Sequence, residues 1–292
     1  MKKLILIFGL YALPVVAQES PDLSTLLMKA TFKISGPKMN MPNMKTIGTC
    51  FIIGRPNPQD PNWSHFVLVT ADHVLKDMSG ETAFISLRKK VNAAYVKMAW
   101  AIRIREKKKP LWTKHPDVDV AVMYVSLPKE AEVVFLPMKF LATDVELKKY
   151  EIRPADRLLA LGFPFSQESN AAGFPILRSG VIASYPILPT KTTKSMLFDF
   201  EVFHGNSGGP VFMIEKNRSY GGSVRVGNTI QFIVGLVSQE RNIKFQYSTL
   251  YEQKLQRHPL KLGIIVHASL IKEAIKMLPQ LKDTTATGNS LK

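Results

Sequence analysis

Short apolar runs recur along most of the chain, and polar residues, glycines or prolines separate them. They lie at residues 46–53, 66–70, 83–87, 120–125, 158–161, 180–184 and 230–237. Runs of this length, bounded by turn-forming residues such as those at 55–62, are typical of β-strands. The pattern therefore predicts an all-β protein built as barrels or a sandwich, and not from alternating strands and helices.

One segment near the end of the chain has a helical period instead. Its recurring apolar residues are Ala268, Ile271, Ala274, Ile275 and Leu278. This spacing places them on one helix face, and Pro279 favours an end to the helix there. We expect a C-terminal helix at about 267–278. Residues 279–292 show no apolar period, and we expect a disordered tail.

The first residues have the order of a secretory signal peptide. Lys2 and Lys3 precede an apolar run at 4–16, and the small residue Ala17 follows it. A membrane-spanning helix needs about 20 apolar residues, so this run predicts a removed signal and no stable membrane insertion. We expect residues 1–17 to be cleaved and the protein to be exported, either to the periplasm or as a secreted protein.

About 275 residues would remain, enough for one large all-β domain or for two lobes that share an interface. Cys50 is the one cysteine, which excludes an intramolecular disulfide even in an exported chain. Because Cys50 lies inside an apolar run, we expect a buried structural thiol. Stability must then come from packing.

The formal net charge of +16 favours attraction to anionic partners in general without identifying one. The densest basic run, 103–109, includes Glu106 and no aromatic residue, so it is more typical of a solvated loop than of a nucleic-acid site. Three methionines, Met39, Met41 and Met44, could offer soft ligands to copper, but a short loop with such residues is more often incidental. We expect no nucleic-acid partner, metal or cofactor.

The strongest chemical signal is Gly205-Asn206-Ser207-Gly208-Gly209-Pro210. Glycines around a serine allow a substrate backbone to approach, and the amides of Gly205 and Ser207 could together hold an oxyanion. An ordinary turn between two strands is the plain alternative. The same letters fit a nucleophile elbow, which must run into a helix, and Gly209-Pro210 opposes one.

A serine nucleophile needs a base and an orienting acid. His73 closes the apolar strand that ends in Thr70-Ala71-Asp72, which would hold its ring at the edge of a cleft. Asp119 directly precedes the apolar run at 120–125. Asp117 shares a face with it by alternation, so spacing alone does not separate the two. We favour Asp119 and keep Asp117 as the alternative.

Three segments of the chain resemble the signature blocks of trypsin-like serine proteases, and they occur in the family's order. They are Thr70-Ala71-Asp72-His73, Asp119-Val120-Ala121-Val122 and Gly205-Asn206-Ser207-Gly208-Gly209-Pro210. Segments 161–164 and 179–184 are similar to those of bacterial members without disulfides. The resemblance implies two antiparallel six-stranded β-barrels with a C-terminal helix. It implies a peptidase domain at 18–278, with the first barrel at about 26–140 and the second at about 150–266.

The resemblance also implies site roles. Ser207 would be the nucleophile, His73 the general base and Asp119 the orienting acid, with an oxyanion hole at Gly205 and Ser207. Substrate-binding positions would be Glu201, His204 and Ser238, and the substrates would be proteins or peptides.

The matching positions also bear on specificity and activation. Glu201 stands where trypsins select basic side chains, whereas Val237 replaces the histidine of glutamyl endopeptidases, so we expect broad selectivity that disfavours acidic residues. Asn206 stands where zymogens place an aspartate, and we expect no activating cut. A catalytically silent fold kept for binding is the alternative function. The sequence leaves the oligomeric state open.

Overall fold

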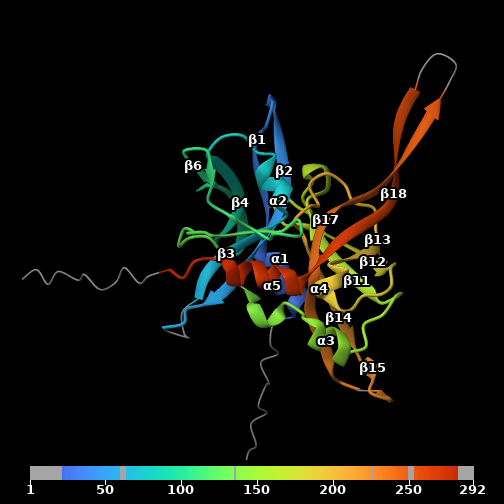
Figure 1. The fold of residues 1–292 in the computed structure, drawn as a ribbon. Coiled ribbons are helices and arrows are strands. Elements are labelled where there is room, and N and C mark those ends of the chain that lie inside the picture. The colour runs from blue at the N-terminus through green and yellow to red at the C-terminus, as the bar shows by residue number, and fades with distance from the viewer. Residues whose placement is uncertain (1–21, 60–63, 135, 225, 249–252, 282–292) are drawn as a thin grey trace, which may run out of the picture.

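The computed structural model describes residues 22–59, 64–134, 136–224, 226–248 and 253–281. These residues form two β-rich lobes with a helix lying across them (Figure 1). The expected signal peptide at 1–17 and residues 282–292 of the expected tail lie outside the described residues. Within the described part, no helix is long and apolar enough to cross a membrane.

The N-terminal lobe is an eight-stranded sheet in the order β5-β4-β1-β2-β3-β9-β8, with β10 paired in parallel to β2. Its strands are β1 (Thr31–Lys38), β2 (Met41–Pro56), β3 (Ser64–Thr70), β4 (Thr82–Val91), β5 (Ala94–Arg103), β8 (Thr113–Lys114), β9 (Ala121–Tyr124) and β10 (Leu136–Pro137). Strands β6 (Arg105–Glu106) and β7 (Lys109–Pro110) form a separate small hairpin. Among the described residues the strand pairs do not close this sheet into a ring, so the expected first barrel is seen as a sheet.

The C-terminal lobe is a closed barrel in the order β11-β12-β13-β18-β17-β14, as the resemblance predicted for this half. Its strands are β11 (Arg157–Gly162), β12 (Ile176–Ile182), β13 (Ser195–Asp199), β14 (Pro210–Lys216), β17 (Thr229–Ser248) and β18 (Gln253–His267). A small hairpin of β15 (Ser219–Tyr220) and β16 (Ser223–Val224) follows β14. Mostly β structure and one closed six-stranded barrel confirm the predicted fold class.

Strands β17 and β18 continue well beyond the barrel as a two-stranded ribbon (Figure 1). Their antiparallel register runs from Gly235↔His267 in the barrel to Ser248↔Gln253 near the tip. The sequence analysis did not predict this ribbon, because it expected the strand from Ile230 to end at Val237.

The helices are short except at the end of the chain. They are α1 (Leu23–Ala30), α2 (Asp72–Lys76), α3 (Asp144–Lys149), α4 (Thr190–Thr193) and α5 (Ala268–Met277), with 3-10 turns at Met138–Phe140 and Pro164–Ser166. Helix α5 confirms the predicted C-terminal helix, whereas α1 was not predicted. The buried face of α1 is Leu23, Leu27 and Ala30.

Two hydrophobic clusters correspond broadly to the two lobes, and α5 belongs to the first of them. Its buried residues Leu270, Ile271 and Ala274 pack with the strands of the N-terminal lobe. Because α5 follows directly from β18 of the second barrel, its burial joins the two lobes. Cys50 is in the same cluster, which confirms the predicted buried thiol.

Arg88 on β4 is a buried cation that holds several segments together. Its guanidinium carbon lies 4.4 Å from the ring centroid of Phe32 and 4.3 Å from that of Phe174. Burial lowers its pKa to about 10, so it remains charged at neutral pH. The guanidinium donates hydrogen bonds of 2.9–3.1 Å to the carbonyls of Met28, Lys29, Thr31 and Gly173. It therefore anchors both the end of α1 and the loop before β12.

Candidate active site

His73 stands where a buried strand meets a short helix. Strand β3 ends at Thr70 and α2 begins at Asp72, so His73 lies in the first helical turn. The first amides of a helix have no intrahelical acceptor. The amide of His73 donates instead to Oδ1 of Asp119 at 3.0 Å. Strand β3 and this hydrogen bond together fix the backbone position from which the imidazole projects.

Asp119 lies in the segment between β8 and β9, and its second oxygen faces the imidazole. Nδ1 of His73 is 2.8 Å from Oδ2 of Asp119. An ionised carboxylate only accepts hydrogen bonds, so the proton of this bond is on Nδ1 and Nε2 is left as the basic nitrogen. The hydroxyl of Ser238 donates to the same Oδ2 at 2.6 Å.

These contacts set the ionisation of the pair. Burial by itself lowers the pKa of His73, but the hydrogen bond and charge of Asp119 raise it above its ordinary value. Burial by itself raises the pKa of Asp119, but the hydrogen bonds from His73 and Ser238 lower it below its ordinary value. The arrangement keeps Asp119 ionised and makes His73 a stronger base.

Asp117, which the sequence could not separate from Asp119, is placed differently. Its carboxylate is 54% exposed and pairs with Nζ of Lys194 at 3.1 Å. It makes no contact with His73 among the interactions of the described residues. Of the two carboxylates, the structure brings only Asp119 to the imidazole.

Ser207 lies in a tight loop between β13 and β14. The amide of Asn206 donates to the carbonyl of Phe203 at 3.0 Å, and that of Gly209 donates to Asn206 at 3.0 Å. Gly205 and Gly208 have φ angles of +98° and +87°. These values favour glycine because L side chains rarely adopt them. The glycines of the motif therefore serve the shape of this loop.

The loop is docked on the N-terminal lobe through Thr49. The amide of Thr49 donates to the carbonyl of Ser207 at 2.8 Å, and its hydroxyl donates to that of Gly205 at 2.6 Å. The hydroxyl of Thr70, at the end of β3, donates to the carbonyl of Thr49 at 2.7 Å. A chain of buried hydrogen bonds thus connects the Ser207 loop to the strand that carries His73.

Close packing brings the Ser207 loop to the His73 segment. A Cβ at Gly208 would lie 3.0 Å from the amide nitrogen of Ala71, two residues before His73. Ser207 itself is half-buried between buried neighbours. Within the described residues its hydroxyl has no hydrogen bond to His73, and the amides of Gly205 and Ser207 donate to no described group.

Asn206 is a buried amide beneath the loop. Its residue is 2% exposed, and Nδ2 has no hydrogen-bond partner among the described residues. A Cβ at Gly162 would lie 2.8 Å from Oδ1 of Asn206, so the amide packs directly on β11. The position before Ser207 is therefore occupied by a neutral, tightly packed side chain.

Glu201 and His204 lie on the approach to this loop. A carboxylate oxygen of Glu201 is 3.9 Å from Nζ of Lys261. Burial and the charge of Glu201 raise the pKa of Glu240 on β17, against smaller opposing effects of His204 and Lys261. The structure thus gathers the two predicted substrate-binding residues with Glu240 and Lys261, which the sequence analysis did not identify.

Ser238, the third predicted substrate-binding residue, has its side chain turned inward. It is 3% exposed, and its hydroxyl is used by Asp119. Contact with a substrate would therefore involve its backbone. No local sequence signal indicated the Ser238–Asp119 hydrogen bond, because the two residues are far apart in the chain.

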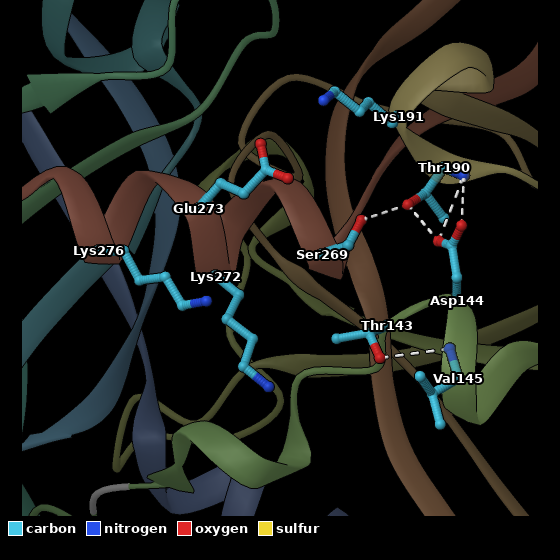
Figure 2. Close-up of a pocket in the computed structure, with 9 residues that line it drawn as sticks. All are labelled: Thr143, Asp144, Val145, Thr190, Lys191, Ser269, Lys272, Glu273 and Lys276. Atoms are coloured by element: carbon cyan, nitrogen blue, oxygen red, sulfur yellow. Dashed lines mark hydrogen bonds between the residues drawn. The ribbon is translucent and has the colours of Figure 1, made fainter.

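A pocket of about 310 Å³ lies on another part of the surface, and none of the candidate site residues lines it (Figure 2). Its lining residues are Thr143, Asp144, Val145, Thr190, Lys191, Ser269, Lys272, Glu273 and Lys276. Met39, Met41 and Met44 are exposed at the β1–β2 hairpin. Among the residues that the structure describes, no group of three or more His, Cys, Asp or Glu side chains could hold a metal ion.

Comparison with known proteins identifies the family. The model of the trypsin-like peptidase domain matches residues 48–221, more than half of the chain. The chain therefore belongs to the family of trypsin-like peptidase domains, as its three sequence blocks indicated. No curated protein sequence matches it.

Three solved structures match the chain at low sequence identity. The thermostable serine protease AL20 from an extremophilic microorganism is 13% identical, with a TM-score of 0.44 over 85% of this chain and 95% of its own. The protease Anisep from Arthrobacter nicotinovorans is 12% identical, with a TM-score of 0.47 over 85% and 94%. Deg5 is 16% identical, with a TM-score of 0.43 over 74% and 82%. The family assignment rests on the family model.

Proposed function

We propose that this trypsin-like peptidase domain is an active, exported serine endopeptidase. The observation that supports it most is the hydrogen bond from Nδ1 of His73 to Asp119 at 2.8 Å. It leaves the basic nitrogen of His73 free on a lobe against which the Ser207 loop is docked. A domain that only binds peptides has no need of this arrangement.

In this proposal Ser207 attacks the peptide carbonyl and His73 takes its proton. Asp119 holds the imidazole in the required tautomer and stabilises its protonated form. His73 then returns the proton to the leaving amine, and water hydrolyses the acyl-enzyme by the same route. The absence of a His73–Ser207 hydrogen bond is compatible with these roles, because such bonds often tighten only when substrate binds.

The amides of Gly205 and Ser207 are the proposed oxyanion donors. They donate to no described group, and the positive φ of Gly205 shapes the loop that presents them. Removing one such donor typically costs about 10²–10³ in rate. The loop geometry is therefore as important to the proposal as the three side chains.

For specificity we propose a broad preference that disfavours acidic side chains. Glu201 and Glu240 place two carboxylates on the approach to the loop, and the cations Lys261 and Arg178 beside Glu201 offset part of their charge. His204 is exposed and stands close enough to Glu240 to affect its pKa. Cleavage-site profiling on a complex peptide mixture tests this, and a profile dominated by Glu before the cleaved bond contradicts it.

Export is proposed from the order of charged, apolar and small residues at 1–17. The peptidase domain is proposed at 18–278, with the closed barrel as its second half. Fractionation of cells that make the full chain tests export. We expect a processed protein that begins at Gln18 in the periplasm or the medium, and an unprocessed protein in the cytosol would contradict it.

A fluorophosphonate probe tests the proposed activity, since it labels activated serines covalently. Protein beginning at Gln18 should be labelled at Ser207, and Ser207→Ala should abolish the labelling. The exposed Ser179 supplies a matched control, because Ser179→Ala should be labelled like the parent protein. A folded parent protein that is never labelled would contradict the proposal and favour a binding module.

A further inference from the structure

The segment that carries Asp119 is tied to distant elements on its outer side. It begins at His115, whose amide donates to the carbonyl of Val120 at 2.9 Å, so that the segment closes on itself. Residues 115–120 belong to no strand, so no neighbouring strand holds them in place. What holds it in place is therefore decisive for where Asp119 lies.

The first tether is the ion pair between Asp117 and Lys194. Nζ of Lys194 lies 3.1 Å from Oδ2 of Asp117, two residues before Asp119. Both backbone polar groups of Lys194 are hydrogen-bonded. Its amide donates to Thr190 at 2.8 Å, and its carbonyl accepts from the amide of His267 at 3.2 Å. The cation is thus presented from a fixed position next to the barrel.

The second tether joins His115 to α5. Nε2 of the buried His115 is 3.5 Å from Oε2 of Glu273. The other ring nitrogen, Nδ1, accepts a hydrogen bond from the amide of Asp117 at 3.1 Å. Nδ1 is therefore unprotonated and, in the neutral ring, Nε2 carries the proton that faces Glu273. His115 connects the helix directly to the backbone of the Asp119 segment.

The two tethers start from neighbouring elements, since Lys194 directly follows α4 and Glu273 lies on α5, and Figure 2 shows hydrogen bonds that join these two helices. The hydroxyl of Ser269 on α5 donates to that of Thr190 on α4 at 2.8 Å. Thr190 in turn donates to the carboxylate of Asp144 through its amide and its hydroxyl. Helices α4 and α5 are therefore fixed to each other, and the two tethers act from one rigid support.

We propose that Lys194 and Glu273 are positioning residues, which hold the Asp117–Asp119 segment against His73 through Asp117 and His115. The inference rests on the proposed function of the His73–Asp119 pair. Neither residue contacts the imidazole or the Ser207 loop, so both act through the segment. A support from outside complements Ser238, which holds Asp119 from the side of the barrel.

The test removes each tether without changing the size of the side chain much. The variants are Lys194→Gln, Glu273→Gln and the two together. A misplacement of about 1 Å can cost about 10²-fold in rate. We expect each single variant, in which the other tether remains, to lower kcat by roughly tenfold while KM changes by less than about twofold. The side chains of Lys194 and Glu273 are 41% and 52% exposed, so neither substitution leaves a buried gap and the variants should fold.

The second readout is the acid limb of the pH dependence of kcat/KM, because it reports the pKa of His73 in the free enzyme. Asp119 raises that pKa, with smaller contributions of the same sign from Asp77 and Asp72. A loosened Asp119 should move the acid limb to lower pH. A change that only destabilised the fold would lower the amount of active enzyme without moving this limb.

Matched controls come from the same helices. Lys191→Gln on α4 and Lys276→Gln on α5 each remove one charge without touching the Asp119 segment, and they should behave like the parent protein. The charge exchange Asp117→Lys with Lys194→Asp should restore most of the kcat that Lys194→Gln loses. Restoration by the exchanged pair identifies the ion pair itself as the cause.

An NMR titration of the His73 imidazole separates this inference from the proposed activity. It is done in protein that carries Ser207→Ala, so that no turnover is needed. We expect a lower pKa of His73 in Lys194→Gln and Glu273→Gln than in the controls, even if the parent protein cleaves no peptide. A pKa of His73 in Lys194→Gln and Glu273→Gln equal to that in the controls would overturn the inference.

Discussion

Asp119 holds His73 through two atoms at once. Its Oδ1 accepts from the backbone amide of His73 at 3.0 Å, and its Oδ2 lies 2.8 Å from Nδ1 of the ring. The first contact fixes the backbone of His73, and the second fixes the orientation of the ring and the position of its proton. A single carboxylate therefore controls the placement and the basicity of the candidate general base.

Replacing Asp119 by asparagine should remove both effects on the ring. The amide group can present a donor where Nδ1 needs an acceptor, so the wrong tautomer is favoured and kcat should fall by about 10⁴. The pKa of His73 should no longer be raised, and the acid limb of kcat/KM should move to lower pH. A pH–rate profile measures both. Asp117→Asn should lower kcat by only about tenfold. A larger loss of kcat in Asp117→Asn than in Asp119→Asn would contradict the assignment of Asp119 as the orienting acid.

Removing the guanidinium of Arg88 should destabilise the fold. Arg88→Met leaves the carbonyls at the end of α1 and in the loop at Gly173 without their buried donor, and each buried acceptor left unsatisfied costs about 1–3 kcal/mol. Arg88→Lys should recover only part of the lost stability, because a lysine ammonium cannot reproduce the planar set of donors of the guanidinium. Urea denaturation measures the free energy of unfolding. Arg103→Met on β5, where the arginine is exposed, is the control.

His267 should make the protein sensitive to acid. It is fully buried with neither ring nitrogen hydrogen-bonded to a described group, and burial lowers its pKa to about 4 against a smaller opposing effect of Asp144. The unfolded chain takes up this proton near pH 6.5. Stability should therefore fall as the pH decreases from about 6.5 to 4, by roughly 3 kcal/mol from this group.

The variant His267→Leu should lose this part of the pH dependence, because it has no proton to take up. Unfolding free energies at several pH values between 4 and 7 measure the effect. An equal decline in the parent protein and in His267→Leu would contradict it.

Asn206 leads us to expect activity without an activating cut. A neutral amide at this position cannot form the ion pair that a newly freed N-terminus makes with an aspartate in zymogen-type relatives. Protein beginning at Gln18 and the same protein with a short N-terminal extension should therefore have equal kcat/KM. An inactive extended form that a defined proteolytic cut restores would show that this is wrong.

The sequence predicted those parts of the fold and site that local patterns encode. Apolar runs marked β3, β9 and the barrel portion of β17, and the helical period marked α5. The glycines around Ser207 indicated its tight loop because that geometry depends on the residues themselves. The start of β12 was misplaced, since exposed and half-buried residues alternate along it without a clear apolar period.

Other features could not be read from local patterns. In strand β5 the more buried Met98, Trp100 and Ile102 alternate with exposed alanines, and because alanine also counts as apolar the period of two is hidden in an almost wholly apolar run. Helix α1 is only eight residues long and follows the apolar N-terminal segment closely. The contacts that Asp119 and Asp117 make with Ser238 and Lys194 join residues that only tertiary packing brings together. For the same reason spacing left Asp117 and Asp119 unresolved until their partners were known.

The most direct measurement of the central claim is hydrolysis of a peptide mixture by purified protein beginning at Gln18, followed by mass spectrometry and compared with Ser207→Ala. We expect internal peptide bonds to be cleaved by the parent protein. Removal of the nucleophile should lower turnover by several orders of magnitude while circular dichroism shows an unchanged fold. Undiminished cleavage by folded, purified Ser207→Ala would contradict the account.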